Sequence, residues 1–68
     1  MITPEFVPLL KKIYGPRPSN FRLGQWAYIC LHEIFPEIAN QINATELDPF
    51  HDDNRVEEMI VAVFTEFL

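Results

Sequence analysis

The chain has a single cysteine, Cys30. A single cysteine cannot form a disulfide within the chain. Together with only two histidines, His32 and His51, it cannot supply the four Cys and His ligands of an ordinary structural zinc site. A free cysteine is typical of a reducing compartment. We therefore expect a cytoplasmic protein without a metal or a cofactor.

The sequence also lacks long hydrophobic runs. No apolar stretch approaches the ~20 residues that a transmembrane helix needs. The N-terminal residues have neither the basic region nor the continuous apolar region of a secretion signal. These absences also predict a cytoplasmic protein.

Positive charge is scarce: five Lys and Arg residues stand against ten Asp and Glu residues, which gives a formal net charge of −5. The basic residues do not form a stripe on any predicted helix, whereas binding to nucleic-acid phosphates requires a basic face. This composition argues against a nucleic-acid partner. An acidic surface instead favours solubility and attraction to basic protein surfaces.

Helical periodicity is the main pattern in the sequence, because apolar residues recur at three- and four-residue spacing. Pro36 removes a backbone hydrogen bond, so we expect it to end the second helix and to begin a short one. The fold class predicted is all-α: a compact bundle of three helices plus one short helix, forming a single domain over residues 1–68. The predicted helices cover residues 4–14, 20–35, 37–43 and 54–67.

Several residues are predicted to mark the helix ends. Thr3 is expected to cap the first helix, and Gly15 to end it in a left-handed conformation. Ser19 or Asn20 is expected to cap the second. Asp52, Asp53 or Asn54 can cap the last, where Asn54 and Glu57 also fit a capping box.

The apolar stripes of these helices form the predicted core, and Leu47 and Phe50 are expected to anchor the loop before the last helix. The predicted stripes are Phe6, Leu9, Leu10 and Ile13; Leu23, Trp26, Ala27, Cys30, Leu31 and Ile34; Ile38, Ala39 and Ile42; and Val56, Met59, Ile60, Val63, Phe64 and Phe67.

A second set of apolar residues lies off these stripes. A domain of this size buries only about 60% of the surface that its unfolded chain exposes, so we expect a homodimer or a higher homo-oligomer to cover the rest. The off-stripe set is Val7, Tyr14, Tyr28, Ile29, Val61 and Leu68. The candidate self-association residues are Ile29, Val61, Phe67 and Leu68.

The polar segment 48–54 has two interpretations. Its carboxylates and His51 are suitable ligands for a divalent cation, but the segment lacks the central glycine and the ligand spacing of an EF-hand. The favoured alternative is structural: Asp48 begins a turn with Pro49 at its second position, and the acids that follow cap the last helix. No motif carries a catalytic site, because Cys30 lies on an apolar face and Pro36 stands where a zinc protease would need a second histidine. We expect a protein that is not an enzyme.

Gly24 is unusual because a glycine inside a helix costs up to about 1 kcal/mol relative to alanine. This predicts that another segment passes close to it. We expect the 47–53 segment to do so, with Arg22 pairing with Asp48 or Asp52. Alternatively, Arg22, Gln25 and Trp26 line a groove for a ligand or a partner peptide. The candidate binding surface comprises Arg17, Arg22, Gln25, Trp26, Tyr28 and His51.

Four short motifs occur in order: Arg-Leu-Gly-Gln at 22–25, Phe-Pro-Glu at 35–37, Thr-Glu-Leu-Asp-Pro-Phe at 45–50 and Asp-Asp-Asn-Arg at 52–55. Over residues 20–67 this order resembles a group of short, mostly uncharacterised phage and prophage proteins. That pattern has a glycine where this chain has Ala44. The resemblance implies a phage accessory protein in the cytoplasm of the host cell, and it implies no catalytic residues.

Two functions are compatible with these observations. The first is non-catalytic binding to an unidentified host protein, as a modulator or a counter-defence inhibitor. The second is an oligomer that binds a small nucleotide signal in pockets between subunits. In that case Arg17 and Arg22 would contact phosphate, and Trp26 or Tyr28 would contact the base.

Overall fold

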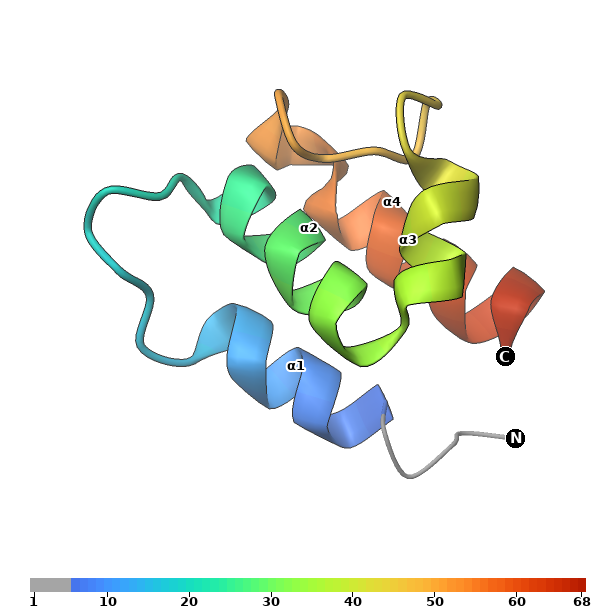
Figure 1. Ribbon diagram of the computed structural model, residues 1–68, viewed down its shortest axis with the longest axis horizontal. Coiled ribbons are helices and arrows are strands. Elements are labelled where there is room, and N and C mark those ends of the chain that lie inside the picture. Colours follow the sequence, from blue (N-terminus) through green and yellow to red (C-terminus); the bar gives the residue numbers. More distant parts are fainter. Residues whose placement is uncertain (1–5) are drawn as a thin grey trace.

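The computed structural model describes residues 6–68, which contain helices and no strand. The helices are α1 (Phe6–Tyr14), α2 (Leu23–Ile34), α3 (Pro36–Ile42) and α4 (Val56–Ala62), as Figure 1 shows. A 3₁₀ turn (Asp53–Arg55) leads into α4, and a π-helical stretch (Val63–Phe67) follows it. The predicted all-α fold is confirmed. The predicted cap Thr3 lies outside the described residues.

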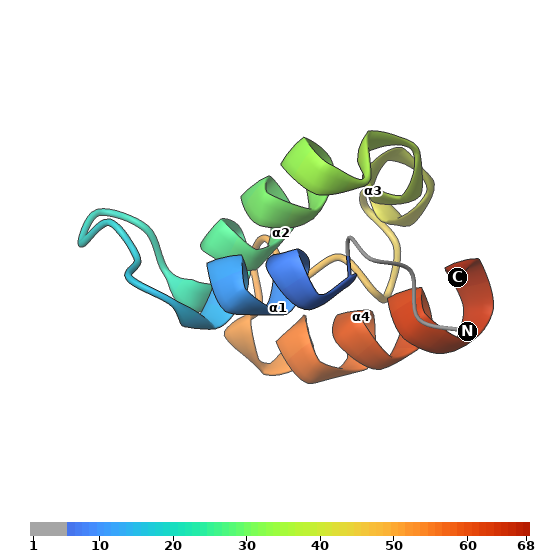
Figure 2. The ribbon, with the colours of Figure 1, turned by 90° about the horizontal axis from the view of Figure 1, so that it is seen from below.

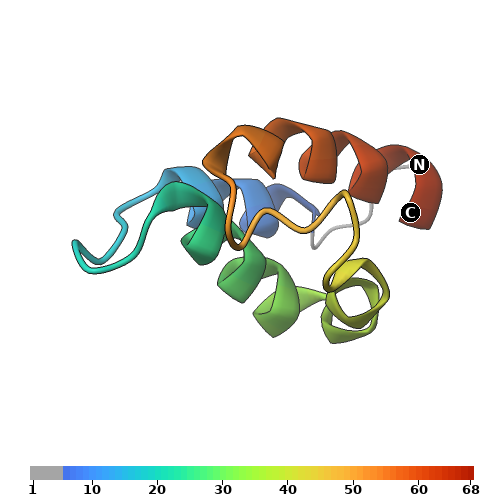
Figure 3. The same ribbon diagram turned by 90° about the horizontal axis from the view of Figure 1, so that it is seen from above.

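Helix α2 is the centre of the bundle, because it contacts α1, α3, α4 and the 3₁₀ turn. Figure 2 shows α1 on the near side, with α2 and α4 on either side of it. The opposite view in Figure 3 shows residues 43–52 crossing from α3 back to the start of α4. This crossing segment leads to Asp53, whose carboxylate lies at the N-terminus of α2.

The buried core matches the predicted stripes closely. Its members pack together because all four helices turn one apolar face inward. The buried apolar side chains are Phe6, Leu9, Ile13, Ala27, Cys30, Leu31, Ala39, Ile42, Val56, Met59, Ala62 and Val63. Phe64 differs from its prediction, since it is 37% exposed and packs at the surface against Phe6, with ring centroids 5.1 Å apart.

Pro36 and Gly15 lie at helix ends, and only Pro36 acts there as expected. Pro36 is the first residue of α3, where its missing amide hydrogen has no helical partner to lose. The left-handed stop predicted at Gly15 is wrong, because neither glycine in the described residues has a positive φ. Gly15 is required for space instead: a Cβ there would stand 2.5 Å from the carbonyl oxygen of Lys11.

The predicted caps have different outcomes: the caps predicted for α2 are wrong, and one of the three candidates for the last helix is confirmed. Helix α2 begins at Leu23 with Arg22 as its N-cap, because residues 18–21 form a turn in which the Phe21 amide donates to the Pro18 carbonyl at 3.1 Å. At the other end of the chain Asp52, one of the three predicted candidates, is the capping residue, and the capping box predicted at Asn54 does not form. The Asp52 carboxylate accepts the Asn54 amide at 2.9 Å and so starts the 3₁₀ turn.

Candidate functional site

Arg22 and Asp53 form a junction between the start of α2 and the 3₁₀ turn. The Arg22 guanidinium donates from Nη1 to Asp53 Oδ1 at 3.0 Å and from Nη2 to the Phe50 carbonyl at 2.7 Å. The predicted partners Asp48 and Asp52 are wrong. Asp53 takes this place because Asp48 and Asp52 bind amides in their own turns.

The same carboxylate caps α2 from a distant part of the chain. Asp53 Oδ1 accepts the Gly24 amide at 2.9 Å, which is the bond that an N-cap side chain ordinarily makes. A Cβ at Gly24 would collide with the Pro49 carbonyl oxygen and would stand 2.9 Å from Asp53 Oδ1. The predicted close approach at Gly24 is therefore confirmed.

The segment before this junction is held by turns of its own. Asp48 accepts the Ala44 amide at 2.7 Å and the Phe50 amide at 2.9 Å. Pro49 is fully buried, and its carbonyl accepts the Asp52 amide at 3.0 Å. Asp48 thus begins an Asx turn with Pro49 at its second position, as predicted, and Pro49 also begins the turn that follows.

Ala44 stands at a position suited to glycine. Its φ is 63°, in the left-handed region that costs an L-residue roughly 1–2 kcal/mol. A glycine would adopt this conformation without that cost.

The polar segment contains a small hollow of about 340 Å³, lined by Ala44, Thr45, Asp48, His51, Asp52 and Arg55. Arg55 Nε lies 3.5 Å from Asp52 Oδ2, so this cation partly balances the acids. Within residues 6–68, no three His, Cys, Asp or Glu side chains gather closely enough to hold a metal ion. The Asp48 carboxylate accepts backbone amides in its turn, and the Asp52 carboxylate caps the 3₁₀ turn and pairs with Arg55.

Trp26 and Tyr28 join α2 to its neighbours. The Trp26 indole Nε1 donates to the Lys12 carbonyl at 3.0 Å, at the C-terminal end of α1, where helix carbonyls lack intrahelical partners. Tyr28 donates to the Ala39 carbonyl at 3.3 Å and meets the Phe50 ring edge-on at 6.0 Å. Burial, and secondarily the charge of Asp48, raises the pKa of Tyr28.

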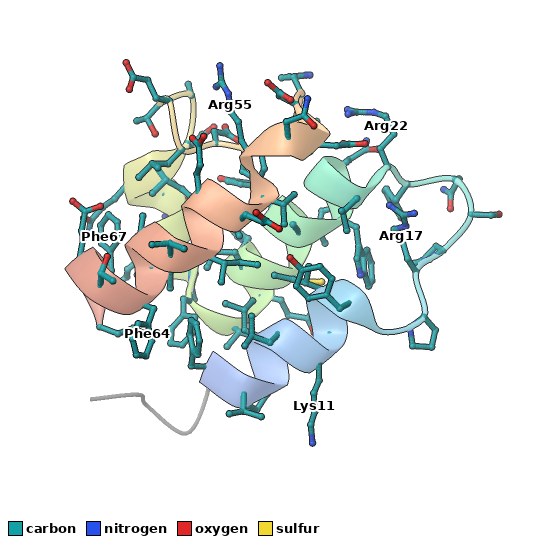
Figure 4. The ribbon with its side chains drawn as sticks, turned by 180° about the vertical axis from the view of Figure 1, so that it is seen from behind. Lys11, Arg17, Arg22, Arg55, Phe64 and Phe67 are labelled. Carbon is teal, nitrogen blue, oxygen red and sulfur yellow. The ribbon has the colours of Figure 1, made fainter. Side chains whose placement is uncertain are left out.

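The six residues of the predicted binding surface therefore make separate contacts in different parts of the structure. Gln25 accepts the Arg22 amide at 3.3 Å, His51 is exposed beside Phe50, and Arg17 is exposed in the α1–α2 loop. Figure 4 shows Arg17 and Arg22 at the end of the bundle where that loop lies, and Phe64 and Phe67 at the other end.

Cys30 is fully buried in the core. Burial raises the pKa of its thiol, an effect that nearby Lys12 opposes and Glu33 reinforces. A thiol kept protonated is a poor nucleophile. The side chain acts as a small core residue.

The predicted self-association residues have different environments. Phe67, Leu68 and also Tyr28 are partly buried against the core, so one chain covers more apolar surface than expected. Ile29 is half-buried. Val61 is 59% exposed, as the prediction requires, and the other exposed large apolar residues are Val7 at 48%, Tyr14 at 57% and Phe64 at 37%.

Val61 lies in a shallow groove on the outer side of α4, which we name the α4 groove. The groove has a volume of about 390 Å³ and is lined by Leu47, Glu57, Glu58, Val61, Ala62, Thr65 and Glu66. Its three glutamates are exposed, and within residues 6–68 none of them forms an ion pair. The groove thus combines an apolar floor with an acidic rim.

Sequence reasoning identified Val61 but not the glutamates around it. A signal was present, because residues three and four apart share a helix face and Glu57, Glu58 and Val61 have that spacing. Leu47 could not be placed beside them from the sequence, since it comes from the segment that crosses from α3 to α4.

No known protein family, curated protein or solved structure matches this chain. Among residues 6–68, no helix has the length and apolarity needed to cross a membrane.

Proposed function

We propose that this chain is a non-catalytic protein-binding module that uses the α4 groove to bind a host protein with a basic surface. One observation carries the proposal: Val61, at 59% the most exposed large apolar side chain among residues 6–68, lies in a groove with three glutamates. Apolar contacts supply much of the free energy of protein association, and a charged rim speeds association and selects partners of opposite charge.

The distribution of charge along the chain supports a basic partner. Seven of the ten acidic residues lie between 46 and 66, where Arg55 is the only Lys or Arg. Such an excess of one sign on one part of the surface attracts the opposite charge over distances of about a Debye length, ~8–10 Å at ordinary salt.

The internal contacts also favour binding over catalysis. Arg22, Asp53 and Trp26 make hydrogen bonds within the chain, and Cys30 is buried. These side chains stabilise the fold. Together with the resemblance to phage proteins, they suggest an accessory protein that modulates or inhibits a host protein, for instance in counter-defence.

Affinity capture with matched variants tests this proposal. Wild-type protein and a Glu57→Lys/Glu58→Lys variant are immobilised and exposed to bacterial lysate, and bound proteins are quantified by mass spectrometry. Glu37→Lys/Glu46→Lys, which makes the same change in charge at two exposed sites outside the groove lining, is the control. We expect a recurrent protein that binds wild type and the control but is lost with the α4 variant.

The captured protein is then purified and titrated directly with each variant. Direct binding that weakens with salt and with the α4 substitutions supports the proposal. Equal binding by all three proteins would overturn the assignment to the α4 groove.

A second candidate is the binding of a nucleotide signal between subunits, and one observation favours it. Tyr14 is 57% exposed on the helix that also carries Lys11, and Arg17 follows in the loop; both cations are exposed. An exposed aromatic ring and nearby cations are groups that stack on a base and contact phosphate. Arg22 is already occupied in the junction, which leaves Arg17 as the arginine for this role.

Release of bound small molecules distinguishes the second candidate. Purified protein is denatured, and the released fraction is analysed by ultraviolet absorbance and mass spectrometry. A nucleotide that is present with wild type and absent with Tyr14→Ala and Arg17→Ala would support this function. Its absence from wild-type preparations would count against it.

Self-association is also part of the proposal. Val7, Tyr14, Val61 and Phe64 remain the exposed large apolar residues among those described. They come from α1, from α4 and from the π-helical stretch that follows α4.

A further inference from the structure

The outer side of α1 carries a cation between two exposed apolar residues. Val7, Lys11 and Tyr14 are spaced by four and three residues, so they share one helix face. Val7 is 48% and Tyr14 57% exposed, and Figure 4 shows Lys11 pointing away from the bundle. Within residues 6–68, Lys11 forms no ion pair, whereas the adjacent Lys12 pairs with Glu33 at 2.5 Å. We name Val7, Lys11 and Tyr14 the α1 face.

The α1 face and the α4 groove are complementary in charge and in polarity. The groove has an apolar floor at Val61 with glutamates and no Lys or Arg in its lining. The α1 face has apolar residues on either side of a lysine that lacks a partner. We propose that the α1 face of one copy docks in the α4 groove of a second copy, with Tyr14 and Val7 against Val61 and with Lys11 among Glu57, Glu58 and Glu66.

This contact joins two different surfaces. When the two copies are not related by a two-fold axis, the contact is heterologous, and each docked pair keeps one free α1 face and one free α4 groove. Such contacts extend into a ring when the rotation closes and into an open chain when it does not. A contact of this small size is expected to be weak and dependent on concentration.

The inference goes beyond the proposed function, although it uses the same groove. A second copy and a basic host protein would compete for the α4 groove. Self-association would then hold the groove closed until the host protein displaces the neighbouring copy.

Sedimentation velocity of the purified chain tests the inference through charge reversal and complementation. Lys11→Glu impairs only the α1 face, and Glu58→Lys impairs only the α4 groove. We expect each variant alone to associate at least about tenfold more weakly than wild type. Glu37→Lys, a charge reversal at an exposed site on α3, is the control for charge, and it is expected to associate as wild type does.

Mixing the two impaired variants gives the decisive result. The Lys11→Glu chain keeps its groove and the Glu58→Lys chain keeps its α1 face, so the mixture is expected to form a one-to-one dimer and to stop there. Wild type is expected to grow beyond a dimer as concentration rises, and to dissociate in high salt. Melting curves establish that each variant is folded.

Two results would overturn the inference: a wild type that is monomeric at its solubility limit, or a mixture that stays monomeric. Because the experiment uses only this chain, neither of these results bears on the capture of a host protein.

Discussion

Replacing Gly24 with alanine sets helix propensity against the packing of the Arg22–Asp53 junction. In an exposed helix the substitution would stabilise the protein by up to about 1 kcal/mol. Here the added Cβ would collide with the Pro49 carbonyl and would stand 2.9 Å from Asp53 Oδ1 and 3.1 Å from Asp53 Cα. Two of these obstacles are backbone atoms, so the 49–53 segment has to move.

The size of the effect follows from the contacts that such a movement breaks. Loss of the bond between the Gly24 amide and Asp53 removes a helix cap, worth about 0.5–2 kcal/mol. Displacement of the buried Pro49 and of the exposed Arg22–Asp53 pair adds roughly 1–2 kcal/mol. After subtraction of the propensity gain, we expect Gly24→Ala to destabilise the protein by about 1–3 kcal/mol.

Thermal unfolding followed by circular dichroism measures this directly. For a domain of this size, 1 kcal/mol shifts Tm by about 4–8 °C, so the expected loss is easily resolved. Asp53→Asn is the matched variant: its amide oxygen can still cap α2 while the ion pair is lost, and we expect a decrease below about 1 kcal/mol. A rise in Tm for Gly24→Ala would refute the reasoning, because helix propensity alone would then decide the outcome.

Three further predictions concern single side chains. Ala44→Gly should stabilise the protein by about 0.5–1 kcal/mol in urea unfolding, because it relieves a left-handed alanine; a loss of stability would contradict this account. Trp26→Phe should cost about 1–3 kcal/mol in the same assay, since the Lys12 carbonyl loses its donor, and an unchanged midpoint would show that water replaces the indole. The pKa of Tyr28 is raised above 10.0 in the folded protein, so the folded state holds this proton more tightly. The stabilising effect is complete below pH 10.0 and is lost as the pH rises through the folded pKa; Tyr28→Phe should flatten that part of a stability–pH curve, and an identical curve would contradict it.

The sequence was most informative where residues act locally. The stripes in α1, α2 and α4 predicted most of the core, because a helix repeats every 3.6 residues whatever it packs against. Pro36 marked the start of α3 for an equally local reason. Gly24 showed that a second segment passes nearby, since its helix penalty required a compensating contact.

Local sequence patterns could not predict which residues contact Gly24. Asp48, Asp52 and Asp53 are similar in sequence, and their roles differ only because the turns at 44–52 assign each carboxylate to a different amide. The same limit applies to the α4 groove, where Leu47 meets α4 through the path of the crossing segment. It applies to Tyr28 and Leu68 as well, which lie off the predicted stripes yet pack against the core.

The cap that Asp53 supplies to α2 has a consequence for how the chain folds. The first turn of the central helix is completed by a carboxylate that stands 29 positions later in the sequence. A fragment that ends before residue 53 would therefore lose order at Leu23 and Gly24 even though it contains the whole of α2. During synthesis, this helix acquires its N-terminal hydrogen bond only after the last quarter of the protein has begun to emerge.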